Sequence, residues 1–176
     1  MRTLEQIIPE GMSLEEFLLR CRTDFKFWCE RVIQTPENHE KGLIIKPFHL
    51  EWFRAFYKKE RSCIIAPRGS GKTEILGVAF SLWIAFFNQF QEFLIISRTM
   101  EQSTKLLERI KLTIQENELL RKLVPKKFEL AWSKTEINTS TRCKIFCKPY
   151  TEAVRGVHVD YVLLDEASTY LSLIHI

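Results

Sequence analysis

One segment of eight residues, Ala66–Thr73, constrains the fold of this chain more than any other. It reads APRGSGKT and lies between an expected apolar strand, residues 63–66, and an expected apolar helix, residues 72–87. This order of strand, turn and helix is typical of a phosphate-binding loop. Its glycines let backbone N–H groups face phosphate oxygens, and the helix N-terminus adds a partial positive charge. One position departs from the usual pattern, since Ala66 stands where that pattern has its first glycine.

The side chains of the loop predict ATP and Mg²⁺ as its ligands. Lys72 would reach the β- and γ-phosphates, and the Thr73 hydroxyl would hold Mg²⁺. The alternative is a glycine-rich turn with a solvated lysine, which the flanking strand and helix disfavour. The residues expected to contact ATP in this loop are Pro67, Arg68, Gly69, Ser70, Gly71, Lys72 and Thr73.

A second apolar strand, residues 159–164, ends in the carboxylates Asp165 and Glu166. Asp165 would serve the Mg²⁺ ion through a water molecule, and Glu166 would orient or deprotonate the attacking water. Two carboxylates at the end of a strand are, by themselves, more often simply solvated side chains. Its position 93 residues after Lys72, in a chain of alternating strands and helices, makes the pairing specific.

Two arginines are candidates for stabilising the charge that develops on the γ-phosphate. Arg68 lies inside the loop, whereas Arg155 precedes Gly156 ten residues before Asp165. Local sequence alone favours a surface arginine beside a turn for Arg155.

An aromatic segment upstream is a candidate for the adenine side of the site. Phe48 and His49 follow Pro47, and His49 lies 23 residues before Lys72. Many motor ATPases hold adenine here with an aromatic residue and a glutamine, whose place His49 would take. The alternative is a helix start with Phe48 in the core.

The order of the remaining elements predicts the fold class. One helix is expected after the capping signal at Ser13, and further helices are expected over residues 23–34, 47–59, 72–87 and 99–117. Strands are expected over residues 63–66, 93–96, 134–138, 143–148 and 159–164. Such alternation predicts a P-loop NTPase fold (RecA/ASCE-like), an α/β architecture with a mostly parallel sheet and helices on both faces. We expect an N-terminal helical segment, 1–42, and an ATPase domain, 43–170.

Composition excludes several classes of protein. Hydrophobic residues make up 45% and charged residues 27% of the 176 residues, which argues against disorder. The five cysteines form no C-x-x-C pair, which disfavours disulfide and zinc scaffolds and fits a reducing compartment. The longest apolar run, 75–87, is shorter than the ~20 residues of a membrane span. Residues 1–11 carry no secretory signal pattern.

Several motifs together resemble the large terminase subunit of tailed viruses. They are the loop with an arginine four residues before its lysine, PFHLEW at 47–52, IISRT at 95–99, and RGVHVD at 155–160 before LLDE at 163–166. The resemblance covers roughly residues 43 to 168. Individually the motifs are modest, but their order is fairly specific.

The resemblance implies an ATP-hydrolysing motor that translocates double-stranded DNA into a procapsid. Its implied partners are the portal protein, the small terminase subunit and further copies of itself, in a ring expected to be a pentamer. It implies that Arg155 reaches the nucleotide of a neighbouring subunit. It also implies a location in the host-cell cytoplasm, transiently on the procapsid.

The C-terminus departs from this family pattern. The coupling motif and the nuclease domain of the family would follow the acidic pair, yet the sequence stops ten residues after Glu166, so we expect an incomplete ATPase domain. The last six residues, 171–176, can be back-translated as CTG TCT CTT ATA CAC ATC, which resembles a transposon-type sequencing adapter. We interpret them as a non-native read-through tail, with a short apolar strand as the alternative.

Two other functions remain open from the sequence. Superfamily-2 helicases often read PTGSGKT and DEAH, but this chain has Arg68 and Ser168 at the distinguishing positions. A fragment without the coupling segment would be a nucleotide-binding module without turnover. A nuclease domain downstream would indicate a terminase, and a second motor domain a helicase.

Overall fold

The computed structural model describes residues 1–35, 41–58, 63–126, 132–150 and 158–165. Arg155, Glu166 and the segment 171–176 lie outside the described residues.

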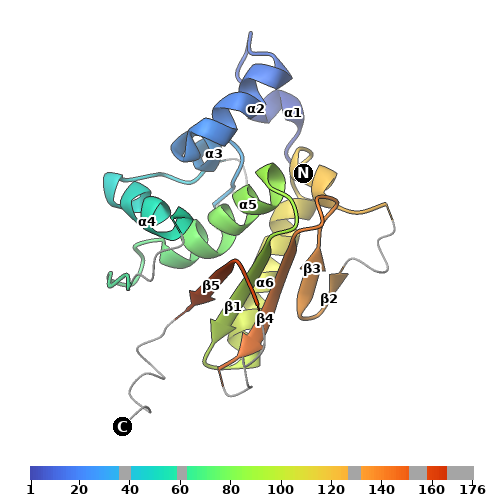
Figure 1. Cartoon of the computed structure of the whole chain (residues 1–176). Helices are drawn as coiled ribbons and strands as arrows, with labels where there is room; N and C mark the ends of the chain where they lie inside the picture. Colours follow the sequence, from blue (N-terminus) through green and yellow to red (C-terminus); the bar gives the residue numbers. More distant parts are fainter. Residues whose placement is uncertain (36–40, 59–62, 127–131, 151–157, 166–176) are drawn as a thin grey trace.

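A five-stranded sheet in the order β2-β3-β4-β1-β5 forms the base of the molecule (Figure 1). β1 runs parallel to β4 and to β5, while β3 is antiparallel to both β4 and β2. The strands are β1 (Glu92–Ser97), β2 (Trp132–Ser133), β3 (Glu136–Asn138), β4 (Lys144–Pro149) and β5 (Tyr161–Leu164). The α/β fold class is therefore confirmed, with three adjacent parallel strands and an antiparallel hairpin at one edge.

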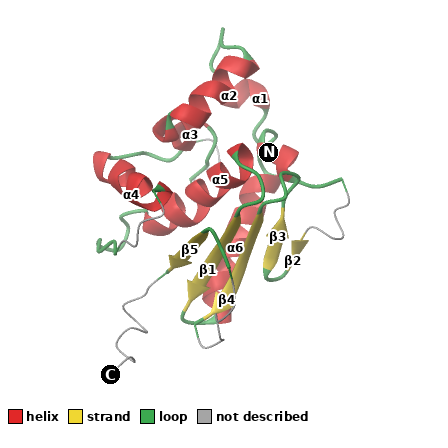
Figure 2. Cartoon of the chain, viewed as in Figure 1, coloured by secondary structure: helices red, strands yellow, loops and turns green. Residues whose placement is uncertain are grey.

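One face of the sheet packs on helices (Figure 2). Phe93 and Ile95 of β1 join the main core there, because alternate side chains of a strand face the same side. Leu94 and Ile96 point to the opposite face and form a small cluster with Phe146, in which no described helix takes part. Among the described residues, helices therefore cover one face of the sheet, whereas the sequence predicts helices on both faces. The covering elements are the π-helix η1 (Thr73–Phe80), α5 (Ser81–Phe87) and α6 (Met100–Gln115).

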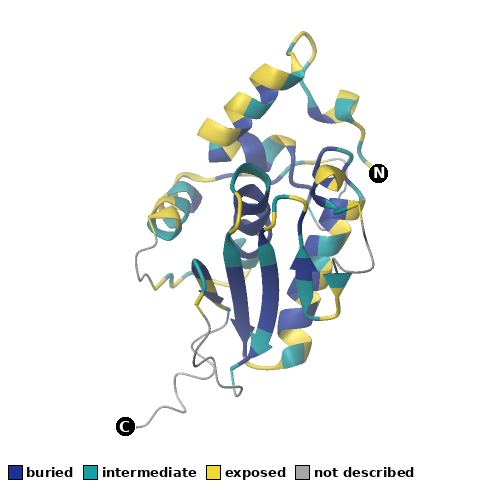
Figure 3. Ribbon diagram, turned by 45° about the vertical axis from the view of Figure 1, so that its right-hand side comes forward, coloured by how far each residue is buried: buried dark blue, intermediate teal, exposed yellow. Residues whose placement is uncertain are grey.

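Hydrophobic periodicity explains how α6 lies on the sheet. The apolar positions that predict a helix, Leu106, Leu107, Ile110 and Ile114, are all buried. The exposed face carries charged residues, which is the usual pattern of a helix on a core. Figure 3 shows the buried stripe of α6 beside the dark central strands.

The N-terminal helices pack above this layer and share its core (Figure 1). Two buried indoles join the layers: the Nε1 of Trp28 donates to the Ala79 carbonyl at 3.1 Å, and that of Trp83 to the Cys21 carbonyl at 3.0 Å. Ser13 caps its helix through the expected reciprocal bonds with Glu16. The N-terminal helices are α1 (Leu4–Ile7), α2 (Leu14–Thr23), α3 (Phe25–Arg31) and α4 (Pro47–Tyr57). A short 3₁₀ helix, η2 (Leu120–Leu123), follows α6.

The expected strand 63–66 is not formed. None of the described strands pairs with it, and Ile65 is 94% exposed. A strand exists only where a neighbour accepts its backbone hydrogen bonds, which apolar composition cannot supply. The helix expected over 72–87 forms, but its first part winds as a π-helix, and Gly77 in that part approaches Leu106 closely.

None of the helices in the described part of the chain is long and apolar enough to cross a membrane.

Candidate nucleotide-binding site

The segment Ala66–Thr73 forms a tight turn that opens η1. Gly69 and Gly71 have φ angles of +76° and +81°, a region that side chains with a Cβ rarely adopt. The Ser70 amide donates to the Pro67 carbonyl at 3.3 Å, which closes the turn. The Lys72 ammonium group donates to the Ala66 carbonyl, so its side chain folds back over the loop. The glycine turn expected from the sequence is therefore present, and phosphate binding by it stays a prediction.

His49 supports this turn from α4. Its side chain is buried, and its Nδ1 accepts a hydrogen bond from the Lys46 amide at 3.1 Å. Nε2 then carries the proton and donates to the Ser70 carbonyl at 2.8 Å. Both ring nitrogens are thus engaged within the protein, and an adenine contact by His49 stays a prediction.

Phe48 offers an open aromatic surface next to the loop. It is 42% exposed, and its ring centroid lies 4.2 Å from that of His49 and 5.1 Å from that of Trp52. The alternative that placed Phe48 in the core is therefore wrong. Its position is compatible with stacking on a base, which stays a prediction.

The two halves of the site meet at Thr73 and Asp165. The Thr73 hydroxyl donates to Asp165 Oδ1 at 3.4 Å, although 92 residues separate them in the sequence. Thr73 is the first residue of η1, and Asp165 directly follows β5. The Asp165 amide donates a hydrogen bond to the Ile96 carbonyl at 2.9 Å, which continues the parallel pairing of β5 with β1. The sequence prediction that these two side chains share a site is consistent with this geometry.

These two oxygens suit the Mg²⁺ ion that the loop implies. Magnesium prefers oxygen ligands and is usually held by one or two protein groups together with substrate phosphates and water. Within the described ranges, no group of three or more His, Cys, Asp or Glu residues is arranged to hold a metal. The donor set therefore fits a metal that arrives with a nucleotide and does not fit an all-protein metal cage.

A cavity of about 380 Å³ adjoins Thr73 and Asp165. One wall is braced by an ion pair of 3.4 Å between Arg109 and Glu74, and Arg109 also donates to the Gln34 carbonyl at 2.8 Å. No local pattern in the sequence predicts this ion pair, since its partners are far apart in the chain. The lining residues are Thr73, Glu74, Ser97, Gln102, Lys105, Leu106, Arg109 and Asp165.

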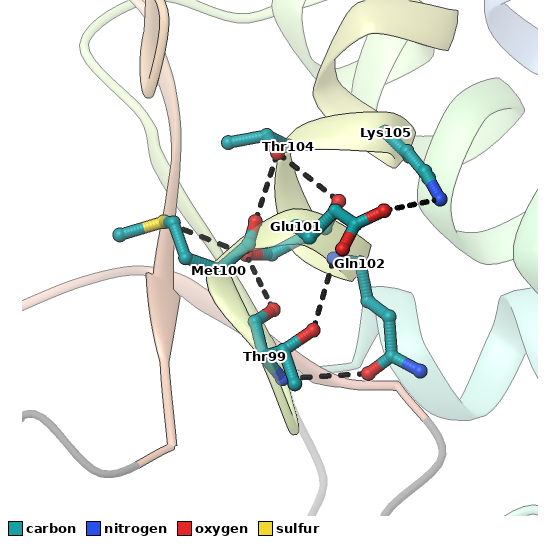
Figure 4. Close-up of polar contacts among 7 residues, drawn as sticks. Thr99, Met100, Glu101, Gln102, Thr104 and Lys105 are labelled. Atoms are coloured by element: carbon teal, nitrogen blue, oxygen red, sulfur yellow. Dashed lines mark hydrogen bonds and ion pairs between the residues drawn. The ribbon is translucent and has the colours of Figure 1, made fainter.

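The first turn of α6 forms the polar rim of this cavity (Figure 4). Thr99 and Gln102 form the expected capping box, in which each side chain bonds the other's backbone amide at 3.3 Å. Glu101 pairs with Lys105 at 2.7 Å, and the hydrogen bond from Lys105 lowers the pKa of Glu101. The cap sets where α6 begins, while the ion pair is solvent-exposed and contributes little to stability.

The remaining site predictions rest on the sequence. Arg68 is exposed on the loop beside Pro67 and Gly69. Arg155 and Glu166 lie outside the described residues, and their roles stay predictions. Glu166 nevertheless follows Asp165 directly in the chain.

Comparisons with known proteins agree with this architecture. Residues 63–170 match the family described as terminase large subunit, T4likevirus-type, N-terminal. The crystal structure of the HK97 bacteriophage large terminase is similar in fold, with a TM-score of 0.62 at 13% sequence identity. The match covers 88% of this chain and 35% of the HK97 chain. No curated protein sequence matches the chain. Because the family match extends over more than half of its residues, this chain belongs to the terminase large subunit family, in the N-terminal region of that subunit.

Proposed function

We propose that this chain is the ATP-hydrolysing part of a phage motor that packages double-stranded DNA into a procapsid. The observation that carries the proposal is the approach of Thr73 and Asp165 to 3.4 Å beside a glycine turn with two positive φ angles. A hydroxyl and a carboxylate at the mouth of a phosphate-binding loop suit Mg²⁺ and the phosphates of ATP.

Each residue of the site has a role in this proposal. Lys72 leaves the Ala66 carbonyl and binds the β- and γ-phosphates, which the backbone amides of the loop surround. Bound Mg²⁺ would neutralise charge on these phosphates. Glu166 accepts a proton from the attacking water, and Arg68 and Arg155 stabilise the γ-phosphate oxygens. Phe48 stacks on the adenine, while His49 holds the loop from behind.

The partners in this proposal come from the family. They are double-stranded DNA, the portal protein, the small terminase subunit and other copies of the chain in a ring, expected to be a pentamer. We expect the motor to work in the host cytoplasm, transiently on the procapsid. A helicase-type ATPase is the less favoured proposal, because the matching family is that of terminases.

Two substitutions in the full-length protein test hydrolysis against binding alone. Lys72→Ala should weaken ATP binding and abolish turnover, because Lys72 contacts phosphates before and during the reaction. Glu166→Gln should keep ATP binding and lose turnover by on the order of 10²-fold or more, the usual effect of removing a general base. Lys122→Ala and Glu15→Gln, both at exposed positions far from the loop in the sequence, are the matched controls.

The outcomes separate the proposals. Parental turnover in Glu166→Gln would contradict the water-activating role. ATP binding without any turnover in the parental full-length protein would instead support a nucleotide-binding module.

A further inference from the structure

Ser97 carries a buried hydroxyl that no group in the described structure satisfies. Its side chain is 2% exposed, and its Oγ has no hydrogen-bond partner. Two other buried serines differ: the Ser103 hydroxyl donates to the Met100 carbonyl at 3.1 Å, and the Ser81 hydroxyl to the Val78 carbonyl at 3.2 Å. An unsatisfied buried hydroxyl is costly and indicates a strained position or an absent partner.

The geometry of the sheet places Ser97 beside Asp165. Side chains 93, 95 and 97 of β1 share one face, and Phe93 and Ile95 show that this face is the one packed on helices. On β5, Leu163 faces the same core, so Asp165 continues that face. The register pairs Ile96 with Leu164, and its next step sets Ser97 opposite Asp165.

The surroundings of Ser97 suit a water molecule. Ser97 lines the same cavity of about 380 Å³ as Thr73, Asp165 and Gln102. A buried water is held by two to four polar partners and needs far less volume than this. The cavity therefore has both the room and the polar groups for a water molecule at Ser97.

We propose that the Ser97 hydroxyl holds the water that attacks the γ-phosphate of ATP. This inference rests on the proposed ATPase function and adds a water-holding residue to it. The Ser97 oxygen accepts one hydrogen of the water. The water oxygen forms a bond to the γ-phosphorus, and the bond from that phosphorus to the bridging oxygen breaks. The electron pair leaves with ADP, and the other proton of the water passes to Glu166.

The rate of hydrolysis, and not the stability, distinguishes a functional Ser97 from a merely structural one. Removing an unsatisfied buried hydroxyl relieves its desolvation cost, so Ser97→Ala should leave the protein as stable as the parent or more stable. If Ser97 only fills space, this variant will also hydrolyse ATP normally. A loss of turnover in a protein of undiminished stability therefore identifies the hydroxyl as functional.

The experiment compares three variants of the full-length protein: Ser97→Ala, Ser97→Thr and the control Ser103→Ala. The measurements are kcat and KM for ATP, the affinity for ADP, the affinity for ADP with aluminium fluoride, and the urea midpoint of unfolding. We expect Ser97→Ala to lower kcat by on the order of 10²-fold, because the water loses its position. KM and ADP affinity should stay within about twofold of the parent, since a group that acts on the water alone leaves ground-state binding intact.

The affinity for ADP with aluminium fluoride and the turnover of Ser97→Thr provide two further tests. ADP with aluminium fluoride mimics the reacting phosphate and its water, so its affinity should fall with kcat in Ser97→Ala. Ser97→Thr keeps the hydroxyl and should recover most of the turnover, since a β-branched residue suits a strand. Ser103→Ala should match the parent in kcat, because Ser103 does not line the cavity beside Thr73 and Asp165.

Two results would overturn the inference while leaving the proposed function intact. One is parental kcat in Ser97→Ala, and the other is an equal loss in Ser97→Ala and Ser103→Ala with a lowered urea midpoint. A parental protein that hydrolyses no ATP would overturn the proposed function itself, and this inference with it.

Discussion

The imidazole of His49 donates from Nε2 to the carbonyl oxygen of Ser70 at 2.8 Å, and so joins the first turn of α4 to the glycine turn Ala66–Thr73. A Cβ on the neighbouring Gly71 would lie 3.7 Å from this same nitrogen, in ordinary contact. The histidine thus packs against the backbone that would surround the phosphates in the proposed function. It makes the loop's shape depend on a helix that precedes it in the sequence.

Loss of this support should weaken both the fold and the site. His49→Ala leaves the Lys46 amide and the Ser70 carbonyl without their partner. We expect the free energy of unfolding to fall by about 1–3 kcal/mol, because two partly buried hydrogen bonds and the buried imidazole are lost. ATP affinity should fall by roughly tenfold if ordering the loop takes about 1.4 kcal/mol from the free energy of binding. Urea unfolding and nucleotide titration measure the two effects.

His158→Ala is the control for this prediction, because that histidine is exposed and does not line the cavity beside Thr73. Parental ATP affinity in His49→Ala would show that the loop keeps its shape without the imidazole.

The local patterns of the sequence predicted most of the elements. Capping signals at Ser13 and Thr99 mark true helix starts, and the alternating residues Cys143, Ile145 and Cys147 all join the main core. Each of these features depends on residues close together in the chain. The same holds for the glycine turn, whose positive φ angles follow from Gly69 and Gly71.

Features that depend on distant partners could not be predicted. The segment 63–66 is apolar enough for a strand but lacks a paired neighbour among the described strands. The link between His49 and Ser70 and the unsatisfied hydroxyl of Ser97 depend on where α4 and β5 lie in space. Likewise, an apolar run predicts a helix but does not distinguish the π winding of η1 from an α-helix.

Tyr161 should make the protein sensitive to alkaline pH. It is 6% exposed, and burial, with smaller effects from Tyr57 and Asp160, raises the pKa of its phenol to about 12. The unfolded phenol titrates near 10. The contribution of Tyr161 to stability is therefore complete below pH 10 and is lost as the pH rises toward 12.

The expected loss is a few kcal/mol at most, at ~1.4 kcal/mol for each pKa unit. Urea unfolding of the parent and of Tyr161→Phe between pH 9 and 12 measures it. The parent should lose stability more steeply than the variant over this interval. Parallel curves would show that Tyr161 titrates alike in the folded and unfolded states. The buried thiols titrate in both proteins, so their contribution cancels in the comparison.

Thiol labelling should find one reactive cysteine among the five of the chain. Cys63 is exposed, whereas the other four are buried. Burial raises the pKa of Cys21 to about 12 and that of Cys29 well above its usual value, so neither forms the reactive thiolate at neutral pH. A native protein treated with a small thiol reagent should take up one equivalent, and Cys63→Ser should take up none. Rapid labelling of a second thiol would contradict the packing around Cys21 and Cys29.

Substitution of Arg155 tests whether neighbouring subunits of a ring share an active site. In the proposed function it serves the γ-phosphate of the neighbouring subunit, and an arginine supplied in this way is worth about 10³–10⁵ in rate. Arg155→Ala in the assembled full-length protein should therefore bind ATP nearly normally and hydrolyse it poorly. Arg22→Ala, on the exposed side of α2, is the control and should match the parent.

Mixing two inactive variants separates action between subunits from action within one. A Glu166→Gln subunit keeps its arginine, and an Arg155→Ala subunit keeps its own hydrolytic site. Wherever a Glu166→Gln subunit supplies its Arg155 to the nucleotide of an adjacent Arg155→Ala subunit, one competent site forms. Mixed rings should then regain turnover that neither variant has alone, with a maximum at intermediate mixing ratios. If the two variants demonstrably co-assemble and no turnover returns at any ratio, Arg155 acts within its own subunit or serves only the fold.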